Sequence, residues 1–103
     1  MLMPVAVTQQ ETIEEEVRAL EEELKPDVVR IRYDIGQDWT GDWSIFFRIL
    51  LSDRASGRRL GRVARKVRNL IDERIRPEEL GLIAYCSFRS ESEQSELKDP
   101  AWM

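Results

Sequence analysis

Two stretches of alternating apolar residues, separated by a short polar break, constrain this chain more than any other feature. The apolar positions are Val29, Ile31, Tyr33 and Ile35, followed by Trp43, Ile45, Phe47, Ile49 and Leu51. Alternation with a period of two on both sides of a break rich in turn residues is typical of an antiparallel β-hairpin with one buried face. With the loop centred near Trp39, the predicted register places Ile35 opposite Trp43 and Ile31 opposite Phe47.

Helical periodicity on either side of the hairpin predicts two helices that cover its buried face. From Thr12 to Leu24 the apolar residues recur at spacings of three and four, and Thr12 with Glu15 matches the capping-box pattern. A second helical pattern runs from about Arg58 to Ile75. The outer face of the first helix is rich in glutamate and that of the second in arginine, so we expect the helices to lie side by side and to form surface ion pairs.

A third strand is predicted from Leu82 to Arg89, after a short turn at residues 76–81. The element order is therefore helix, strand, strand, helix, strand, which predicts an α+β two-layer sandwich with both helices on one face of a three-stranded sheet. Residues 1–10 are expected to form a flexible leader, residues 11–90 a single domain and residues 91–103 a polar C-terminal tail. The residues expected to be mostly buried include Val29, Ile31, Phe47, Ile49, Val67 and Leu70.

This element order resembles the type II KH-like family of ribosome-binding factor A and also the C-terminal domain of cation-diffusion transporters. The resemblance covers most of the chain, in element order and apolar pattern. KH domains carry a Gly-x-x-Gly clamp, but here Gly57 and Gly61 are separated by three residues, so that motif is absent. The resemblance therefore implies a fold, and no functional residue is carried over from it.

The composition weighs against several classes of function. The chain of 103 residues contains no histidine, which removes the commonest general base and every Ser-His or Cys-His nucleophile. Its one cysteine, Cys86, is expected to be a small buried residue; because it has no disulfide partner within the chain, we expect a cytoplasmic protein. No apolar run approaches the roughly 20 residues that cross a bilayer, so no membrane association is expected. We predict no catalytic residue, cofactor or metal, although a cleft lined by Asp34, Asp38 and Asp42 would point to an enzyme.

The segment from Asp38 to Trp43 allows three interpretations. Aspartate, threonine and glycine favour a turn, which is the preferred one. An exposed Trp39 would indicate a loop that contacts a partner, because tryptophan is enriched among interface hot spots. The two carboxylates and the hydroxyl could instead bind a hard cation such as Mg²⁺ or Ca²⁺.

The sheet face turned away from the helices is the main candidate for function. Guanidinium groups interleaved with aromatic rings are suited to phosphates and unpaired bases. Arg30 is expected opposite Arg48, an arrangement that needs an anion or a carboxylate between them. The candidate residues for binding a partner or RNA are Arg30, Arg32, Phe46, Arg48, Tyr85 and Arg89, together with Trp39 from the loop.

The same face also carries an apolar strip, and this strip favours contact with protein. Its members are Phe46, Leu50, Ile83 and Tyr85. An ordinary half-exposed surface is a third interpretation, and the net charge of −4 weighs against non-specific binding of RNA. We therefore predict a small non-enzymatic interaction protein, as a homodimer or part of a hetero-complex. The alternative is an RNA- or ribosome-associated KH-like module.

Overall fold

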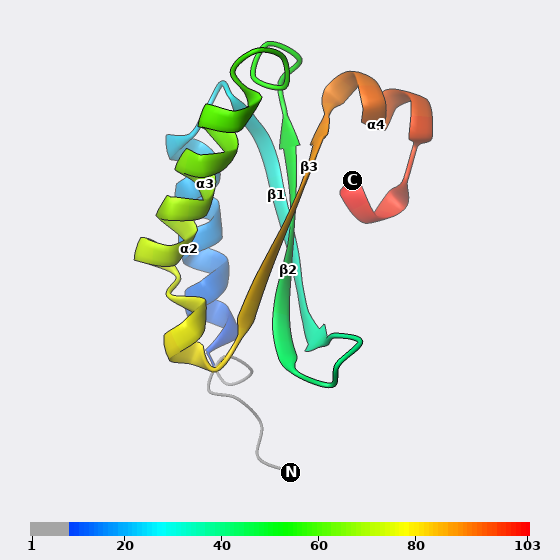
Figure 1. Cartoon of the computed structure of the whole chain (residues 1–103). Coiled ribbons are helices and arrows are strands. Elements are labelled where there is room, and N and C mark those ends of the chain that lie inside the picture. Colours follow the sequence, from blue (N-terminus) through cyan, green and yellow to red (C-terminus); the bar gives the residue numbers. More distant parts are fainter. Residues whose placement is uncertain (1–8) are drawn as a thin grey trace.

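The computed structural model describes residues 9–103, in which three helices and three strands follow the order α-β-β-α-β-α (Figure 1). The elements are α2 (Gln10–Glu23), β1 (Val28–Gln37), β2 (Trp43–Leu51), α3 (Leu60–Arg74), β3 (Ile83–Ser90) and α4 (Glu91–Leu97), with short 3₁₀ turns η1 (Pro77–Leu80) and η2 (Pro100–Trp102). The predicted α+β class is confirmed. Most of the expected leader lies outside the described residues, and Gln10 already belongs to α2.

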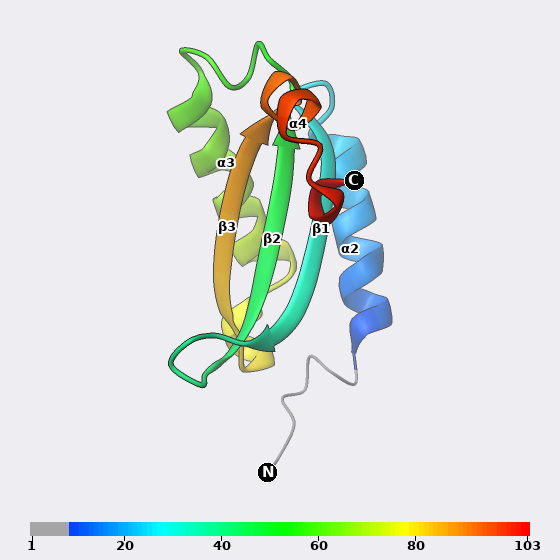
Figure 2. The same ribbon diagram turned by 90° about the vertical axis from the view of Figure 1, so that its right-hand side faces the viewer.

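The three strands form one mixed sheet in the order β1-β2-β3. β1 and β2 are antiparallel, as a hairpin requires, whereas β3 runs parallel to β2. α3 makes the crossover between β2 and β3, and α2 and α3 both lie on one face of the sheet (Figures 1 and 2). The opposite face, which we call the outer face, is the one predicted to carry the functional residues.

The predicted hairpin register is wrong by two residues. Ile35 lies opposite Ile45 rather than Trp43, and Gln37 takes the position opposite Trp43. The difference comes from the loop, where the amide of Asp38 donates a hydrogen bond of 2.9 Å to the carbonyl oxygen of the residue four positions later. Because a shift of two preserves the alternation, the apolar residues of the hairpin from Ile31 onward stay on the face to which they were assigned.

An irregularity at the start of β1 overturns one predicted core position. The pairing shifts between Val28 and Arg30, so that Val28 lies opposite Leu51 and is fully buried. Val29 is only half-buried, and its predicted burial is therefore wrong. Leu70 is also only half-buried, because it packs at the margin of the core rather than inside it.

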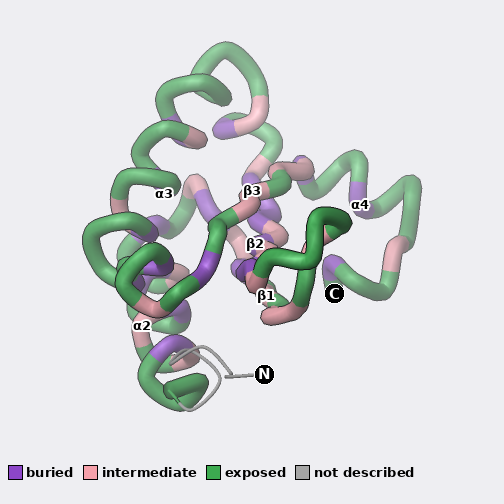
Figure 3. Tube along the Cα trace, turned by 60° about the horizontal axis from the view of Figure 1, so that its bottom comes forward, coloured by how far each residue is buried: buried purple, intermediate pink, exposed green. Residues whose placement is uncertain are grey.

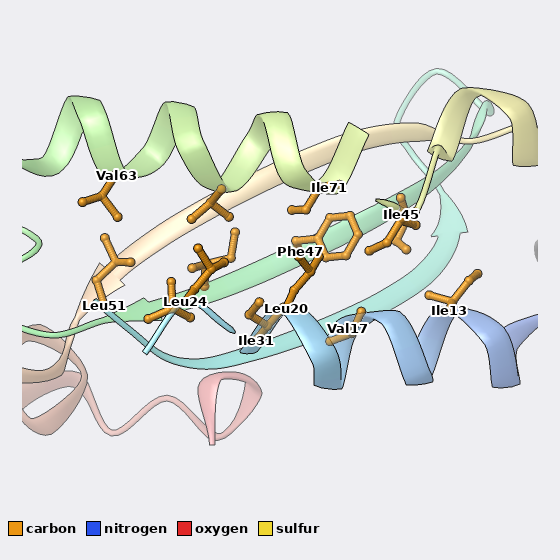
Figure 4. Close-up of a cluster of buried hydrophobic side chains, with 14 of the residues drawn as sticks. Ile13, Val17, Leu20, Leu24, Ile31, Ile45, Phe47, Leu51, Val63 and Ile71 are labelled. Atoms are coloured by element: carbon orange, nitrogen blue, oxygen red, sulfur yellow. The ribbon is translucent and has the colours of Figure 1, made fainter. Parts of the chain in front are cut away.

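The core lies between the inner face of the sheet and the two helices (Figures 3 and 4). Phe47 of the central strand is its largest fully buried side chain. Cys86 is half-buried against this core, and burial raises the pKa of its thiol, as expected of a packing residue. The helical members are Ile13, Val17, Leu20, Val63, Val67 and Ile71, and the main strand members are Val28, Ile31, Ile45, Phe47, Ile49 and Leu51.

The predicted cap of the first helix is also wrong. α2 begins at Gln10, so Thr12 and Glu15 lie inside the helix, and no side chain caps its start. The capping box occurs instead at Ser90 and Glu93, where each side chain accepts a hydrogen bond from the other's backbone amide. The predicted pairing of α2 with α3 is limited: in residues 9–103, a single ion pair, between Arg74 and Glu23 at 2.6 Å, joins the two helices.

Candidate functional site

The carboxylate of Asp38 holds the loop between β1 and β2 in one shape. One of its oxygens accepts hydrogen bonds from the amide and hydroxyl of Thr40, at 2.9 and 2.6 Å, and from the amide of Asp42 at 3.1 Å. The other accepts from the hydroxyl of Ser44 at 3.2 Å and from that of Tyr85 at 2.8 Å. The loop is therefore a tight turn closed around one aspartate, and its shape is tied to β3 through Tyr85.

Hydrogen bonds, above all from the Thr40 hydroxyl, hold the pKa of Asp38 well below its usual range. A carboxyl whose pKa is lowered by folding stabilises the folded state above its unfolded-state pKa of about 4, and this stabilisation is lost as the pH falls toward the folded-state pKa. We therefore expect Asp38→Asn to destabilise the protein at neutral pH and to flatten the decline in unfolding free energy between about pH 5 and pH 2. Urea unfolding across this range measures the effect. Thr40→Ala should flatten the pH dependence of the unfolding free energy in part. An unchanged pH profile in Asp38→Asn would contradict the role of Asp38 in holding the loop.

Three aromatic rings lie in a row on the outer face, at the hairpin end of the sheet. Tyr85 is the middle ring: its centroid is 5.3 Å from that of Phe46, with the rings nearly parallel at 11°, and 5.6 Å from that of Trp39. Phe46 and Tyr85 are direct neighbours across β2 and β3. Trp39 is 82% exposed. We call these three residues the aromatic cluster.

The other end of the outer face is covered by residues 91–103, which we call the strap (Figures 1 and 2). The start of the strap is tied to the loop after β2, since the amide and hydroxyl of Ser92 donate to the carboxylate of Asp53 at 3.0 and 2.7 Å. The side-chain amide of Gln94 donates to the carbonyl oxygen of Asp99 at 2.7 Å. These bonds turn the chain back over the sheet after α4.

Arginines of β1 and β2 hold the end of the strap by its main chain. Each donates a hydrogen bond to a backbone carbonyl oxygen. The bonds join Arg48 to Ala101 at 2.6 Å, Arg30 to Trp102 at 3.2 Å and Arg32 to Met103 at 3.2 Å. The carbonyl oxygens of the strap thus take the place of water as hydrogen-bond acceptors for these guanidinium groups.

Arg89 of β3 contacts side chains of the strap, whereas the other three arginines bind its backbone. Its guanidinium carbon lies 4.4 Å from the ring centroid of Trp102, within the range of a cation–π contact. It also donates to the side-chain oxygen of Gln94 at 3.0 Å and forms an ion pair of 3.5 Å with Asp99. Trp102 is only 7% exposed and anchors the strap to the sheet.

The predicted site residues therefore fall into two groups. The aromatic cluster remains accessible, whereas the four arginines are engaged by the strap. One predicted pairing is wrong: because the register differs by two residues, Arg30 lies opposite Leu50, and Arg32 lies opposite Arg48. The carboxylate that such a pair needs comes from Asp34, which lies 2.7 Å from Arg48.

Sequence reasoning missed the strap as a structural element. The Ser-x-x-Glu pattern of Ser90 and Glu93 was a visible signal for a helix, and Trp102 was an apolar residue at the end of a polar segment. Neither signal indicates where the helix lies, because the contacts that position it join residues far apart in the chain.

The fold and surface define a small α+β protein whose outer sheet face has an aromatic end and a strap-covered arginine end. No protein-family model, curated protein or solved structure matches the chain, so the resemblance to KH-like domains is not confirmed. Within residues 9–103, no helix is long and apolar enough to cross a membrane. The same residues contain no group of three cysteine, aspartate or glutamate side chains placed to hold a metal ion.

Proposed function

We propose that this protein is a non-enzymatic interaction module that binds a protein partner through the aromatic cluster. The observation that carries the proposal is the exposure of Trp39 together with its fixed position against Tyr85. A rigid, exposed tryptophan offers a large apolar contact area and loses little conformational freedom on binding. The partner is a second copy of the chain or a different protein. The single cysteine, Cys86, agrees with a cytoplasmic location.

The charges around the aromatic cluster favour protein over nucleic acid. Asp38 contacts the hydroxyl of Tyr85, and Asp42 lies in the same loop as Trp39, so the charges nearest to Trp39 and to the Tyr85 hydroxyl are negative. Negative charge repels a phosphate backbone, whose binding is dominated by its own charge. A partner surface that is apolar, or that carries a basic rim, fits the cluster better.

A photo-crosslinking amino acid in place of Trp39 tests this function in cells that produce the protein. We expect a discrete covalent adduct with one protein, strongly reduced when Tyr85→Ala removes the ring that supports position 39. Leu97 of α4 is a matched control, because it is also apolar and is 61% exposed, but lies on the strap. A probe at position 97 should give no such adduct. Equal labelling from both positions would contradict the proposal.

A second candidate function is binding of single-stranded RNA, favoured by the nearly parallel stacking of Phe46 on Tyr85 beside Arg48. Unpaired bases stack on such rings while arginines contact the phosphates. The arginines are held by the strap, so this function would require the strap to leave the sheet. Adducts at position 39 that are sensitive to ribonuclease would support this candidate over a protein partner.

A further inference from the structure

The two edges of the sheet differ in whether side chains bond to their free backbone groups. At the β1 edge, the carboxylate of Glu21 on α2 accepts a hydrogen bond of 2.8 Å from the amide of Ile31. At the β3 edge, no side chain among residues 9–103 bonds to the main chain between Ile83 and Arg89. Native proteins usually block an edge strand, since its unpaired amides and carbonyls readily pair with another strand. The β3 edge is thus long and open.

A groove runs beside this open edge, between β3 and α3. It is lined by Arg68 and Asp72 of α3 and by Ala84, Cys86 and Ser87 of β3. Such a groove can receive the inward-facing side chains of an added strand. On the outer face of the same edge, Ile83 leaves 42% of its surface in water.

We propose that a second copy of this chain occupies the edge, pairing its β3 antiparallel with this β3 about a two-fold axis at Cys86. The two three-stranded sheets would then form one continuous sheet. Tyr85 would lie opposite Ser87 of the partner subunit, and Ile83 opposite Arg89 of the partner subunit. The pairing is made by the main chain of β3, which also carries Tyr85 of the aromatic cluster, and it does not depend on the function proposed above.

The charges along the edge explain why the occupant is a second copy. Going along α3, the groove side carries Arg65 and Arg68 first and then Asp72. Beyond Asp72, Arg76 is paired with Glu79 at 3.6 Å, which leaves Glu78 of η1 as a carboxylate without an ion pair among residues 9–103. The edge therefore changes from basic to acidic along its length. Only an antiparallel arrangement of two identical edges brings the basic end of each against the acidic end of the other. Because Arg68 and Asp72 both lie beside Cys86, an axis there places each of them next to its opposite in the partner subunit.

The ion-pair state of these residues agrees with this arrangement. Among residues 9–103, Asp72 has neither an ion pair nor a hydrogen bond, and Arg68 contacts the ring of Phe88 at 5.6 Å without an ion pair.

α3 also crosses the edge obliquely: its N-terminal end lies outside β3 and its C-terminal end behind the sheet (Figure 2). Under a two-fold axis, the N-terminal half of α3, which extends beyond β3, would lie next to the C-terminal half of α3 in the partner subunit, which lies behind the sheet.

A charge exchange on α3 tests the proposed axis. Asp72→Arg alone, or Arg68→Asp alone, should weaken dimerisation by roughly tenfold, because each creates two like-charge contacts per dimer. The double variant Arg68→Asp/Asp72→Arg should restore wild-type dimerisation. Sedimentation velocity over a range of concentrations measures the dissociation constant, and circular dichroism confirms that each variant is folded. A wild-type monomer up to about 500 µM, or a dimer insensitive to both single changes, would overturn the proposal.

Crosslinking tests the strand register independently. In a Cys86→Ser background, Ser87→Cys places a thiol on the exposed outer face, about 7–8 Å from its counterpart as a diagonal neighbour. A bis-maleimide of about 8 Å span should join two copies at this position. Ser95→Cys on α4 is the control and should give little covalent dimer; equal crosslinking by both would refute the register.

Trp39→Ala should leave the dimer intact, so a dimer lost in that variant would place the contact at the aromatic cluster and refute the edge pairing.

Discussion

Replacing Phe47 with alanine is expected to lower the free energy of unfolding by about 3–5 kcal/mol. Phe47 lies on the central strand, is 1% exposed, and sits between Leu20 of α2 and Ile71 of α3 (Figure 4). Its ring also lies 6.3 Å from that of Tyr33. Because the side chain touches both helices and the sheet, the surroundings cannot collapse into the space it leaves. A loss of this size is a large share of the stability of a small domain.

Phe46→Ala is the matched control for this prediction. Phe46 is the next residue on the same strand, but its ring faces outward and stacks on Tyr85, an interaction that contributes about 0.5–1.5 kcal/mol. Urea unfolding of both variants gives the two losses on one scale. A larger loss for Phe46→Ala than for Phe47→Ala would mean that the inner and outer faces are assigned the wrong way round.

Replacing Trp102 with alanine is expected to release the strap without unfolding the domain. Removing a buried tryptophan costs about 3 kcal/mol or more, and the strap can detach while the core stays folded. The cost should therefore appear as a roughly 100-fold increase in local opening of residues 99–103. Amide hydrogen exchange followed by NMR measures this opening. Leu97→Ala, which removes an exposed apolar residue of the same strap, should change it little. Exchange that rises equally across the core would show that the strap is part of the main folding unit.

The same variant separates the two candidate functions. Release of the strap frees Arg30, Arg32 and Arg48 from the carbonyl oxygens they bind. If the outer face binds RNA, Trp102→Ala should bind single-stranded RNA more tightly than the wild type, and its affinity should fall steeply with salt. If the aromatic cluster serves a protein partner, RNA affinity should stay negligible in both. The fluorescence of Trp39 can report the titration of the wild type and of the variant with RNA.

The sequence by itself was sufficient for the fold class and for the assignment of faces. A period of two in the strands and of three to four in the helices is set by local backbone geometry, so it can be read without knowing the contacts. This is why Ile31, Phe47 and Val67 were assigned correctly to the core. It is also why the arginines and aromatic residues were placed on one outer face.

The tertiary structure alone decided the hairpin register, the division of the outer face and the open edge. The register depends on five hydrogen bonds that converge on Asp38, one of them from Tyr85, 47 residues away. The strap lies where it does because Arg48 and Trp102 meet partners more than 50 positions distant in the chain. Contacts of this kind have no local periodicity, because they depend on how folded elements meet in space. A sequence pattern therefore identifies which residues face outward, and only the packed molecule determines which of them the chain itself covers.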